Sequence, residues 1–139
     1  MLGPQRPLRA PWREAFAVRL SPVTINGGFE PRGLGLAPLA VAPDFQRRGF
    51  ASRLVEAGLR RARRLGYAYV TVLGRPEYYS RFGFVVASQH GLSYRGASEP
   101  SFMALELVPG ALRDARGAVE YHSAFSADFS LRSGSQALL

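Results

Sequence analysis

The junction over residues 43–52 constrains the fold of this chain more than any other segment. An apolar run at residues 34–41 is typical of a strand, and a helical pattern over about residues 49–65 follows it. A helix start offers unpaired backbone N–H groups and the positive end of a dipole, so it suits an anion such as phosphate. Arg47 and Arg48 stand at this point and add charge-assisted donors. The junction therefore predicts a pyrophosphate cradle.

The elements on either side of this junction indicate how it is built into a sheet. Apolar residues recur at helical spacing within residues 49–65, and Gly66 is suited to close the helix. Residues 67–73, rich in valine and tyrosine, are typical of a short buried strand. A strand, a helix and a second strand in this order predict a right-handed crossover between parallel strands.

The strand that enters the junction is expected to follow a hairpin and to be irregular. Residues 15–25 alternate as a strand does, and Asn26-Gly27-Gly28 is a strong turn signal before the second arm, residues 34–41. That arm contains Pro38, whose nitrogen cannot donate to a sheet. We therefore expect the arm to bulge, or to diverge from a neighbouring strand, near Pro38.

The remaining segments complete a single domain. Residues 77–82 suit a short helix, and residues 118–121 suit a last edge strand. The chain has 139 residues, and no repeat or linker divides it. We assign an irregular lead to residues 1–14, the domain to residues 15–126 and a flexible tail to residues 127–139.

Composition excludes several classes of function. Cysteine is absent, which excludes a disulfide framework, a thiolate metal site and a cysteine nucleophile. No run of about eighteen apolar residues and no apolar leader is visible, so we expect a cytoplasmic protein without a membrane anchor. The net charge of +8, carried by arginine without lysine, fits nucleic acid, a phosphorylated cofactor or a merely arginine-rich composition, and no nucleic-acid motif supports the first of these. His90 and His122 are isolated, which favours surface or hydrogen-bonded roles.

Two motifs in this order resemble those of a known family. Residues 39–43, Leu-Ala-Val-Ala-Pro, and then residues 46–51, Gln-Arg-Arg-Gly-Phe-Ala, are similar to the acetyl-CoA signature of GCN5-related N-acetyltransferases, the GNAT superfamily. Residues 77–84, Glu-Tyr-Tyr-Ser-Arg-Phe-Gly-Phe, resemble its later motif, an aromatic pair followed by Gly-Phe. With residues 102–107, Phe-Met-Ala-Leu-Glu-Leu, the chain more narrowly resembles the YhbS-like acetyltransferases.

The resemblance implies an α/β fold with a mixed, largely antiparallel sheet and flanking helices. It implies acetyl-CoA as cosubstrate, no metal, and direct attack of an amine on the thioester in a ternary complex. The backbone N–H of Val41 would polarise the thioester carbonyl. The pantetheine arm and the pyrophosphate would be held by Leu39, Ala40, Val41, Gln46, Arg47, Arg48, Gly49, Phe50, Ala51 and Ser52.

The resemblance also assigns a general acid. Tyr79 would protonate the departing CoA thiolate, as a phenol near neutral pH can. Adjacent residues on a short helix cannot share a face, so we expect Tyr78 to pack in the core. Arg47 and Arg48 retain an alternative role as solvated helix charges, and Arg81 suits a cofactor contact and a surface position equally.

The front of the chain is shorter than the resemblance implies. Family members begin with a strand, two helices and another strand before the position of Phe16, and here about fifteen irregular residues precede it. We therefore expect an N-terminally truncated GNAT fold whose exposed sheet edge favours a homodimer. The expected function is acetyl transfer to a small-molecule or peptide amine; the alternative is a non-catalytic acyl-CoA-binding or interaction module.

Overall fold

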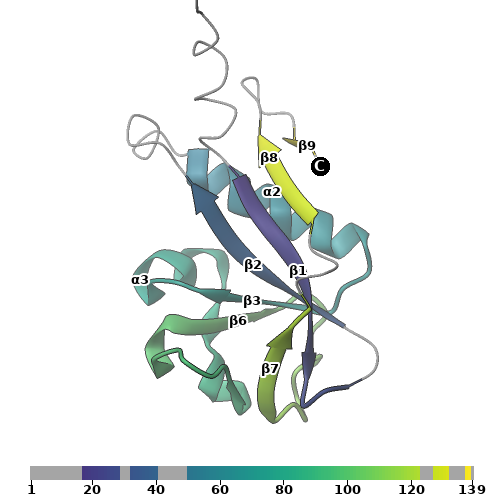
Figure 1. Ribbon diagram of the computed structural model, residues 1–139, viewed down its shortest axis with the longest axis vertical. Coiled ribbons are helices and arrows are strands. Elements are labelled where there is room, and N and C mark those ends of the chain that lie inside the picture. Colours follow the sequence, from purple (N-terminus) through teal and green to yellow (C-terminus); the bar gives the residue numbers. More distant parts are fainter. Residues whose placement is uncertain (1–16, 29–31, 41–49, 123–126, 132–136, 139) are drawn as a thin grey trace, which may run out of the picture.

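The described part of the chain is organised around one mixed sheet. A computed structural model describes residues 17–28, 32–40, 50–122, 127–131 and 137–138. The strands are β1 (Ala17–Ile25), β2 (Gly33–Ala40), β3 (Tyr69–Leu73), β4 (Val85–Val86), β5 (Leu92–Ser93), β6 (Phe102–Glu106), β7 (Gly117–Tyr121), β8 (Ala127–Leu131) and β9 (Ala137–Leu138). The helices are α2 (Phe50–Arg64) and α3 (Pro76–Tyr79), with single 3₁₀ turns η3 (Ser80–Phe82), η4 (Ala87–His90) and η5 (Glu99–Ser101). The strand order is β4-β6-β3-β2-β1-β7-β5, and β8 pairs with both β1 and β9 (Figure 1).

The predicted hairpin is confirmed, and its turn is hydrogen-bonded to the start of β7. β1 and β2 are antiparallel, and Asn26 and Gly27 take the positive φ values, 52° and 70°, that such a turn requires. The Asn26 side chain accepts a hydrogen bond from the Ala118 N–H at 3.0 Å and donates one to the Arg116 carbonyl at 2.9 Å. A Cβ on Gly117 would lie 2.2 Å from that side chain, so glycine lets the start of β7 approach the turn.

The helix crossover predicted from residues 34–73 is also present. β2 and β3 pair in parallel, and α2 connects the end of one to the start of the other. The apolar side of α2 packs on one face of the sheet, where burial of each large side chain contributes about 1.5–3 kcal/mol. The buried residues of this cluster include Leu20, Leu34, Leu36, Leu54, Val55, Leu59, Ala62, Val70 and Val72.

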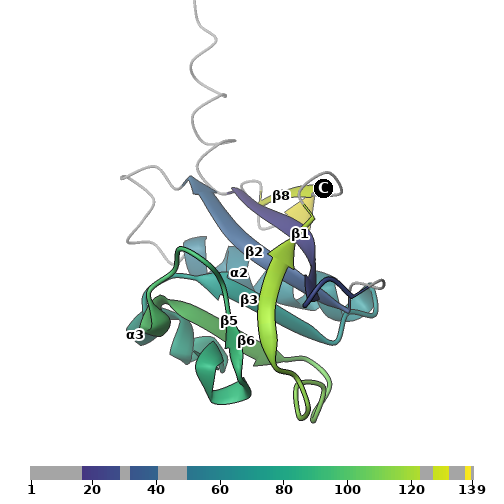
Figure 2. The same ribbon diagram turned by 60° about the horizontal axis from the view of Figure 1, so that its bottom comes forward.

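Aromatic rings cover the opposite face of the sheet. Gly35 leaves room there for Tyr121 of β7, because a Cβ on Gly35 would lie 2.2 Å from a ring carbon of Tyr121. The Tyr121 hydroxyl lies 3.2 Å from Thr71 Oγ1, and its ring centroid lies 5.0 Å from that of Tyr94. Burial raises the pKa of Tyr121, which therefore stays neutral. Figure 2 brings β7 in front of the sheet, on the side away from α2.

Strands from the C-terminal part of the chain occupy the outer edge of β1. β8 pairs with residues 17–20 of β1 and β7 pairs with residues 23–25, and the His122 N–H donates to the Pro22 carbonyl between them at 2.8 Å. Strands of the same chain therefore cover this edge of β1, and the homodimer expected from an exposed sheet edge stays a prediction. Two assignments also change: residues 118–121 lie between β1 and β5 rather than at an edge, and residues 127–131 form a strand rather than a tail.

The backbone turns away from the sheet at the end of β6. β6 stops at Glu106, and the N–H groups of Leu107 and Val108 both donate to the Ala68 carbonyl, at 2.8 and 3.1 Å. Among the helices in the described ranges, none has the length and apolar character needed to cross a membrane.

The Glu106 carboxylate holds the loop that follows β6. It accepts hydrogen bonds from the N–H of Leu112 at 2.8 Å and from the N–H of Gly110 at 3.1 Å. These backbone donors lower the pKa of Glu106, and His90 and Arg113 add to the effect against a small desolvation cost. The negative charge of Glu106 therefore stabilises the folded chain.

Glu106→Gln should make the stability of the protein less dependent on acid. A carboxyl whose pKa is lowered on folding stabilises the fold above its unfolded pKa of about 4.3, and this contribution is lost as pH falls through the folded pKa. The variant should lose about 1 kcal/mol near pH 7, and the difference should shrink on acidification. Thermal unfolding between pH 7 and pH 3 measures it, with Glu120→Gln on β7 as an exposed control. Parallel melting curves for Glu106→Gln and the parent at every pH would contradict this role.

Candidate active site

The two central parallel strands, β2 and β3, separate at one end. β2 and β3 pair from Gly33 with Tyr69 to Leu36 with Val72, after which β2 continues to Ala40 without β3. Figure 1 shows β1 and β2 leaving β3 and β6 at an angle. Within the described ranges, no strand pairs with residues 37–40 of β2 on the side that faced β3. Backbone N–H and C=O groups on this side are thus available to a ligand.

Pro38 lies within the separated part of β2, as the sequence predicted. On the other side, β2 stays paired with β1, where Val18 faces Pro38 and Ala17 faces Ala40. The register shift leaves Leu39 as an extra residue, which is a β-bulge. Both predicted alternatives are therefore present: β2 bulges against β1 and diverges from β3.

The predicted cofactor-binding residues fall on both sides of a segment outside the described ranges. Leu39 and Ala40 are the last residues of β2, and Phe50, Ala51 and Ser52 form the first turn of α2. Among the described residues, only the two ends of the cradle are therefore placed. The other members, Val41, Gln46, Arg47, Arg48 and Gly49, lie outside the described residues.

Ser52 connects the start of α2 to the later motif. Its hydroxyl lies 3.1 Å from the Tyr78 hydroxyl and accepts a hydrogen bond from Arg81 Nη2 at 3.0 Å. The Arg81 guanidinium also lies over the Tyr78 ring, 4.7 Å from its centroid, in cation–π geometry. The two motifs recognised in the sequence therefore touch through side chains. Nothing in the sequence signals this contact, since the residues are 26 and 29 positions apart.

Tyr78 and Tyr79 line one hollow at the end of β3. This hollow of about 320 Å³ is bounded by Leu73, Gly74, Arg75 and the two tyrosines, beside the point where β2 and β3 separate. The Tyr79 side chain is only 6% exposed and packs edge-on against Phe84, with ring centroids 5.7 Å apart. Tyr79 is thus the more buried of the pair. Tyr78, which was expected to be the core residue, is half-buried and hydrogen-bonded to Ser52.

Burial controls the protonation of Tyr79. Desolvation, with a smaller contribution from Tyr78, raises the pKa of Tyr79 to about 12. The phenol therefore carries its proton throughout the neutral range, and it can act as a hydrogen-bond or proton donor but not as a base.

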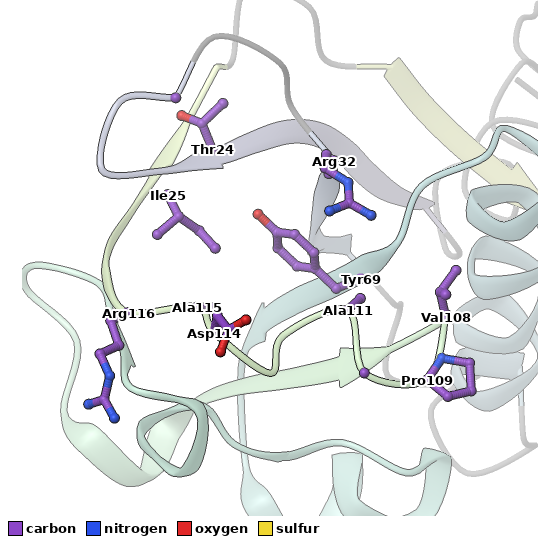
Figure 3. A pocket seen from close by; sticks show the side chains of 12 residues that line it. Thr24, Ile25, Arg32, Tyr69, Val108, Pro109, Ala111, Asp114, Ala115 and Arg116 are labelled. Atoms are coloured by element: carbon purple, nitrogen blue, oxygen red, sulfur yellow. The ribbon is translucent and has the colours of Figure 1, made fainter.

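A second and wider hollow lies at the other end of β3. It measures about 630 Å³, and Figure 3 shows the Tyr69 phenol and the Arg32 guanidinium directed into it. Burial raises the pKa of Tyr69 to about 12 despite the opposing effect of Arg32. Tyr69 begins β3, three positions and thus about 10 Å along the strand from Val72. This hollow is therefore separate from the opening between β2 and β3.

Neither histidine lines either of the two hollows at the ends of β3. His122 Nε2 lies 2.8 Å from Thr24 Oγ1, so this side chain is a hydrogen-bonded part of the sheet, one of the roles expected from its isolation. His90 ends η4 and lies in another surface depression, near Glu106. Within the described residues, no three His, Asp or Glu side chains converge as metal ligands would.

Comparison with known proteins identifies the family. Residues 17–86, half of the chain, match the family described as the acetyltransferase (GNAT) domain. The uncharacterized N-acetyltransferase YhbS of Escherichia coli strain K12 is 41% identical over 110 residues, which cover 78% of this chain and 65% of YhbS. The chain belongs to the GNAT family of acetyltransferases. It spans less than two thirds of the curated relative that it matches.

Solved structures share the fold. YhbS from Escherichia coli in complex with CoA matches with a TM-score of 0.73 and 40% identity, covering 80% of this chain and 62% of that one. A GNAT family acetyltransferase from Brucella melitensis in complex with acetyl-CoA matches with a TM-score of 0.60 and 31% identity, covering 79% of this chain and 60% of that one. The predicted α/β GNAT-type fold is confirmed.

Gly74→Ala should distort the hollow at the end of β3. An added Cβ would lie 2.2 Å from a ring carbon of Tyr79, so the buried ring must move. We expect a loss of about 1–3 kcal/mol in the free energy of unfolding, measured by denaturant titration. Gly58→Ala in α2 is the matched control, because its Cβ meets Leu36 at an ordinary 3.6 Å and alanine favours a helix by up to about 1 kcal/mol. Equal stabilities of the two variants would contradict the packing described for Tyr79.

Proposed function

We propose that this chain binds acetyl-CoA in the opening between β2 and β3 and transfers the acetyl group to an amine. The separation of these strands beyond Leu36 and Val72, beside the hollow that Tyr78 and Tyr79 line, carries the proposal. Family membership supports it, as do the relatives whose structures contain CoA or acetyl-CoA. The acceptor belongs to the class of small-molecule or peptide amines.

The separated part of β2 is suited to the pantetheine arm. The arm contains amide groups, which can pair with backbone N–H and C=O groups as an additional strand would. Pro38 offers only a carbonyl, so the pairing would rely on backbone groups of its neighbours Leu39, Ala40 and Val41. Val41 is the proposed donor to the thioester oxygen, where negative charge develops during attack. Residues 46–52 at the start of α2 are the proposed pyrophosphate ligands.

The proposed reaction needs one proton donor on the protein. The amine lone pair attacks the thioester carbonyl carbon, the resulting tetrahedral intermediate breaks its C–S bond, and the CoA sulfur departs with that electron pair. Tyr79 is the proposed donor to this sulfur, because its hydroxyl is protonated and it lines the hollow at the strand opening. The amine releases its proton to water or to a base that we do not assign.

The raised pKa of Tyr79 is compatible with this role. If the CoA thiol kept its solution pKa near 8.5, proton transfer from the buried Tyr79 phenol, with a pKa of about 12, would be uphill. Desolvation in the same hollow also raises the pKa of a thiolate, because burial penalises any charged form. The two pKa values therefore move in the same direction, and the difference that opposes transfer becomes smaller.

Tyr79→Phe should slow turnover while leaving cofactor binding nearly intact. Loss of a general acid lowers kcat by about a hundredfold or more, whereas the ring that packs against Phe84 is retained. Thiol release from acetyl-CoA with a panel of amines measures kcat, and calorimetry measures the Kd for CoA. Tyr78→Phe removes the other hydroxyl of the hollow and should reduce kcat much less.

Two other results would redirect the assignment. If Tyr79→Phe loses CoA affinity, or if Tyr78→Phe has the larger effect on kcat, then Tyr79 is not the acid. Binding of acetyl-CoA by the parent protein without transfer to any amine of the panel would instead support a non-catalytic acyl-CoA-binding module.

A further inference from the structure

A basic depression runs along the outer side of α2. Its volume is about 290 Å³, and α2 and η3 form its walls. Three exposed arginines and one glutamate line it, together with two apolar side chains. The six residues are Glu56, Leu59, Arg60, Arg63, Arg81 and Phe82, and we call this depression the arginine groove.

The arginine groove leads away from the start of α2. Ser52, Glu56, Arg60 and Arg63 recur at spacings of four, four and three, so they share one side of the helix. With a rise of about 1.5 Å per residue, this side extends roughly 16 Å from the first turn of α2 to the last. Arg81 joins it at the first turn through its hydrogen bond to Ser52.

The cations of the groove are only partly neutralised. The side chains of Arg60 and Arg63 make no hydrogen bond or ion pair with any other described residue. Among the residues that line the groove, three guanidinium groups face a single carboxylate, that of Glu56. Guanidinium groups bind phosphate in a bidentate manner, and a phosphomonoester with its two ionisable oxygens uses several such donors. The charge and the donor type of the groove therefore favour a phosphomonoester.

Arg81 is held in position before any ligand binds. Its guanidinium donates to Ser52, lies 4.7 Å from the centroid of the Tyr78 ring and lies 5.9 Å from that of Phe82. The hydrogen bond to Ser52 uses one of the five guanidinium N–H groups of Arg81, so donors remain for a ligand. A side chain fixed in this way loses little conformational entropy when it binds a phosphate.

We propose that the arginine groove binds the ribose 3′-phosphate of CoA, an inference that rests on the acetyl-CoA binding proposed above. The ribose that carries this phosphate also carries the pyrophosphate on its 5′ oxygen, so the two anionic groups lie within one nucleotide of each other. Arg81 is placed to bridge them, because it contacts Ser52 in the first turn of α2 and also lines the groove. The groove therefore distinguishes CoA from 3′-dephospho-CoA.

Calorimetric titration with CoA and with 3′-dephospho-CoA tests this inference. The parent protein should bind CoA at least about tenfold more tightly, which is the effect of one or two charge-assisted hydrogen bonds. Arg81→Ala should weaken CoA binding by about tenfold and change the affinity for 3′-dephospho-CoA by less than about threefold. The double variant Arg60→Ala/Arg63→Ala should act in the same direction while leaving the contact between Arg81 and Ser52 intact.

Matched variants separate a specific site from a general effect of positive charge. Arg64→Ala removes an exposed arginine of the same helix that does not line the groove, and it should leave the ratio of the two affinities unchanged. Glu56→Gln should increase the preference for CoA, because it removes the only carboxylate of the groove. Melting temperatures recorded for every variant identify any that has lost its fold.

Each contrary outcome has a defined meaning. Equal affinity of the parent protein for both ligands overturns the 3′-phosphate site while leaving the proposed function standing. Equal losses for both ligands in Arg81→Ala and in the double variant also overturn it, since the arginines would then serve the rest of the cofactor. Failure of the parent protein to bind either ligand overturns both proposals.

Discussion

The loss of pairing between two parallel strands is the constraint on which the candidate site depends. β2 has a neighbour on each side up to Leu36, and beyond it β1 is its only partner among the described strands. Unpaired backbone inside a sheet is costly unless another partner is found. A proline within this stretch removes one donor and thereby reduces that cost. The same feature that weakens the sheet at this point makes it receptive to a ligand with amide groups.

The opposite face of the sheet limits how far this separation extends. Gly35 and Thr71 form the last pair but one before the strands part, and Tyr121 contacts both. Its ring lies on Gly35 and its hydroxyl approaches Thr71 Oγ1 at 3.2 Å, so one side chain bridges β2 and β3. On the α2 side, Leu36 and Val72 are fully buried. Side chains on both faces of the sheet thus keep β2 and β3 together as far as Leu36 and Val72, and the two strands separate immediately after this pair.

Local signals predicted most of what lies between residues 17 and 86. Asn26-Gly27 specified the hairpin, the apolar spacing of 49–65 specified the crossover helix, and Pro38 specified the irregular strand. For the aromatic pair, the sequence predicted Tyr78 as the core residue, but burial is deeper for Tyr79 than for Tyr78. Contacts between distant segments could not be predicted, because neither the pairing of β7 and β8 with β1 nor the link from Ser52 to Arg81 leaves any periodicity in the sequence. The central cradle residues lie outside the described ranges, so their roles stay predictions.

The position of β1 has a consequence for how the protein folds. Its partner on one side, β2, follows within a hairpin, but the hydrogen bond between the side chains of Thr24 and His122 joins residues 98 positions apart. Closing so long a loop costs entropy before any contact repays it, which slows folding. During synthesis, the outer edge of β1 stays uncovered until β7 has left the ribosome. The nascent chain therefore passes through a period in which β1 offers a free edge to other chains, and rapid completion of the last quarter of the sequence protects the fold from aggregation.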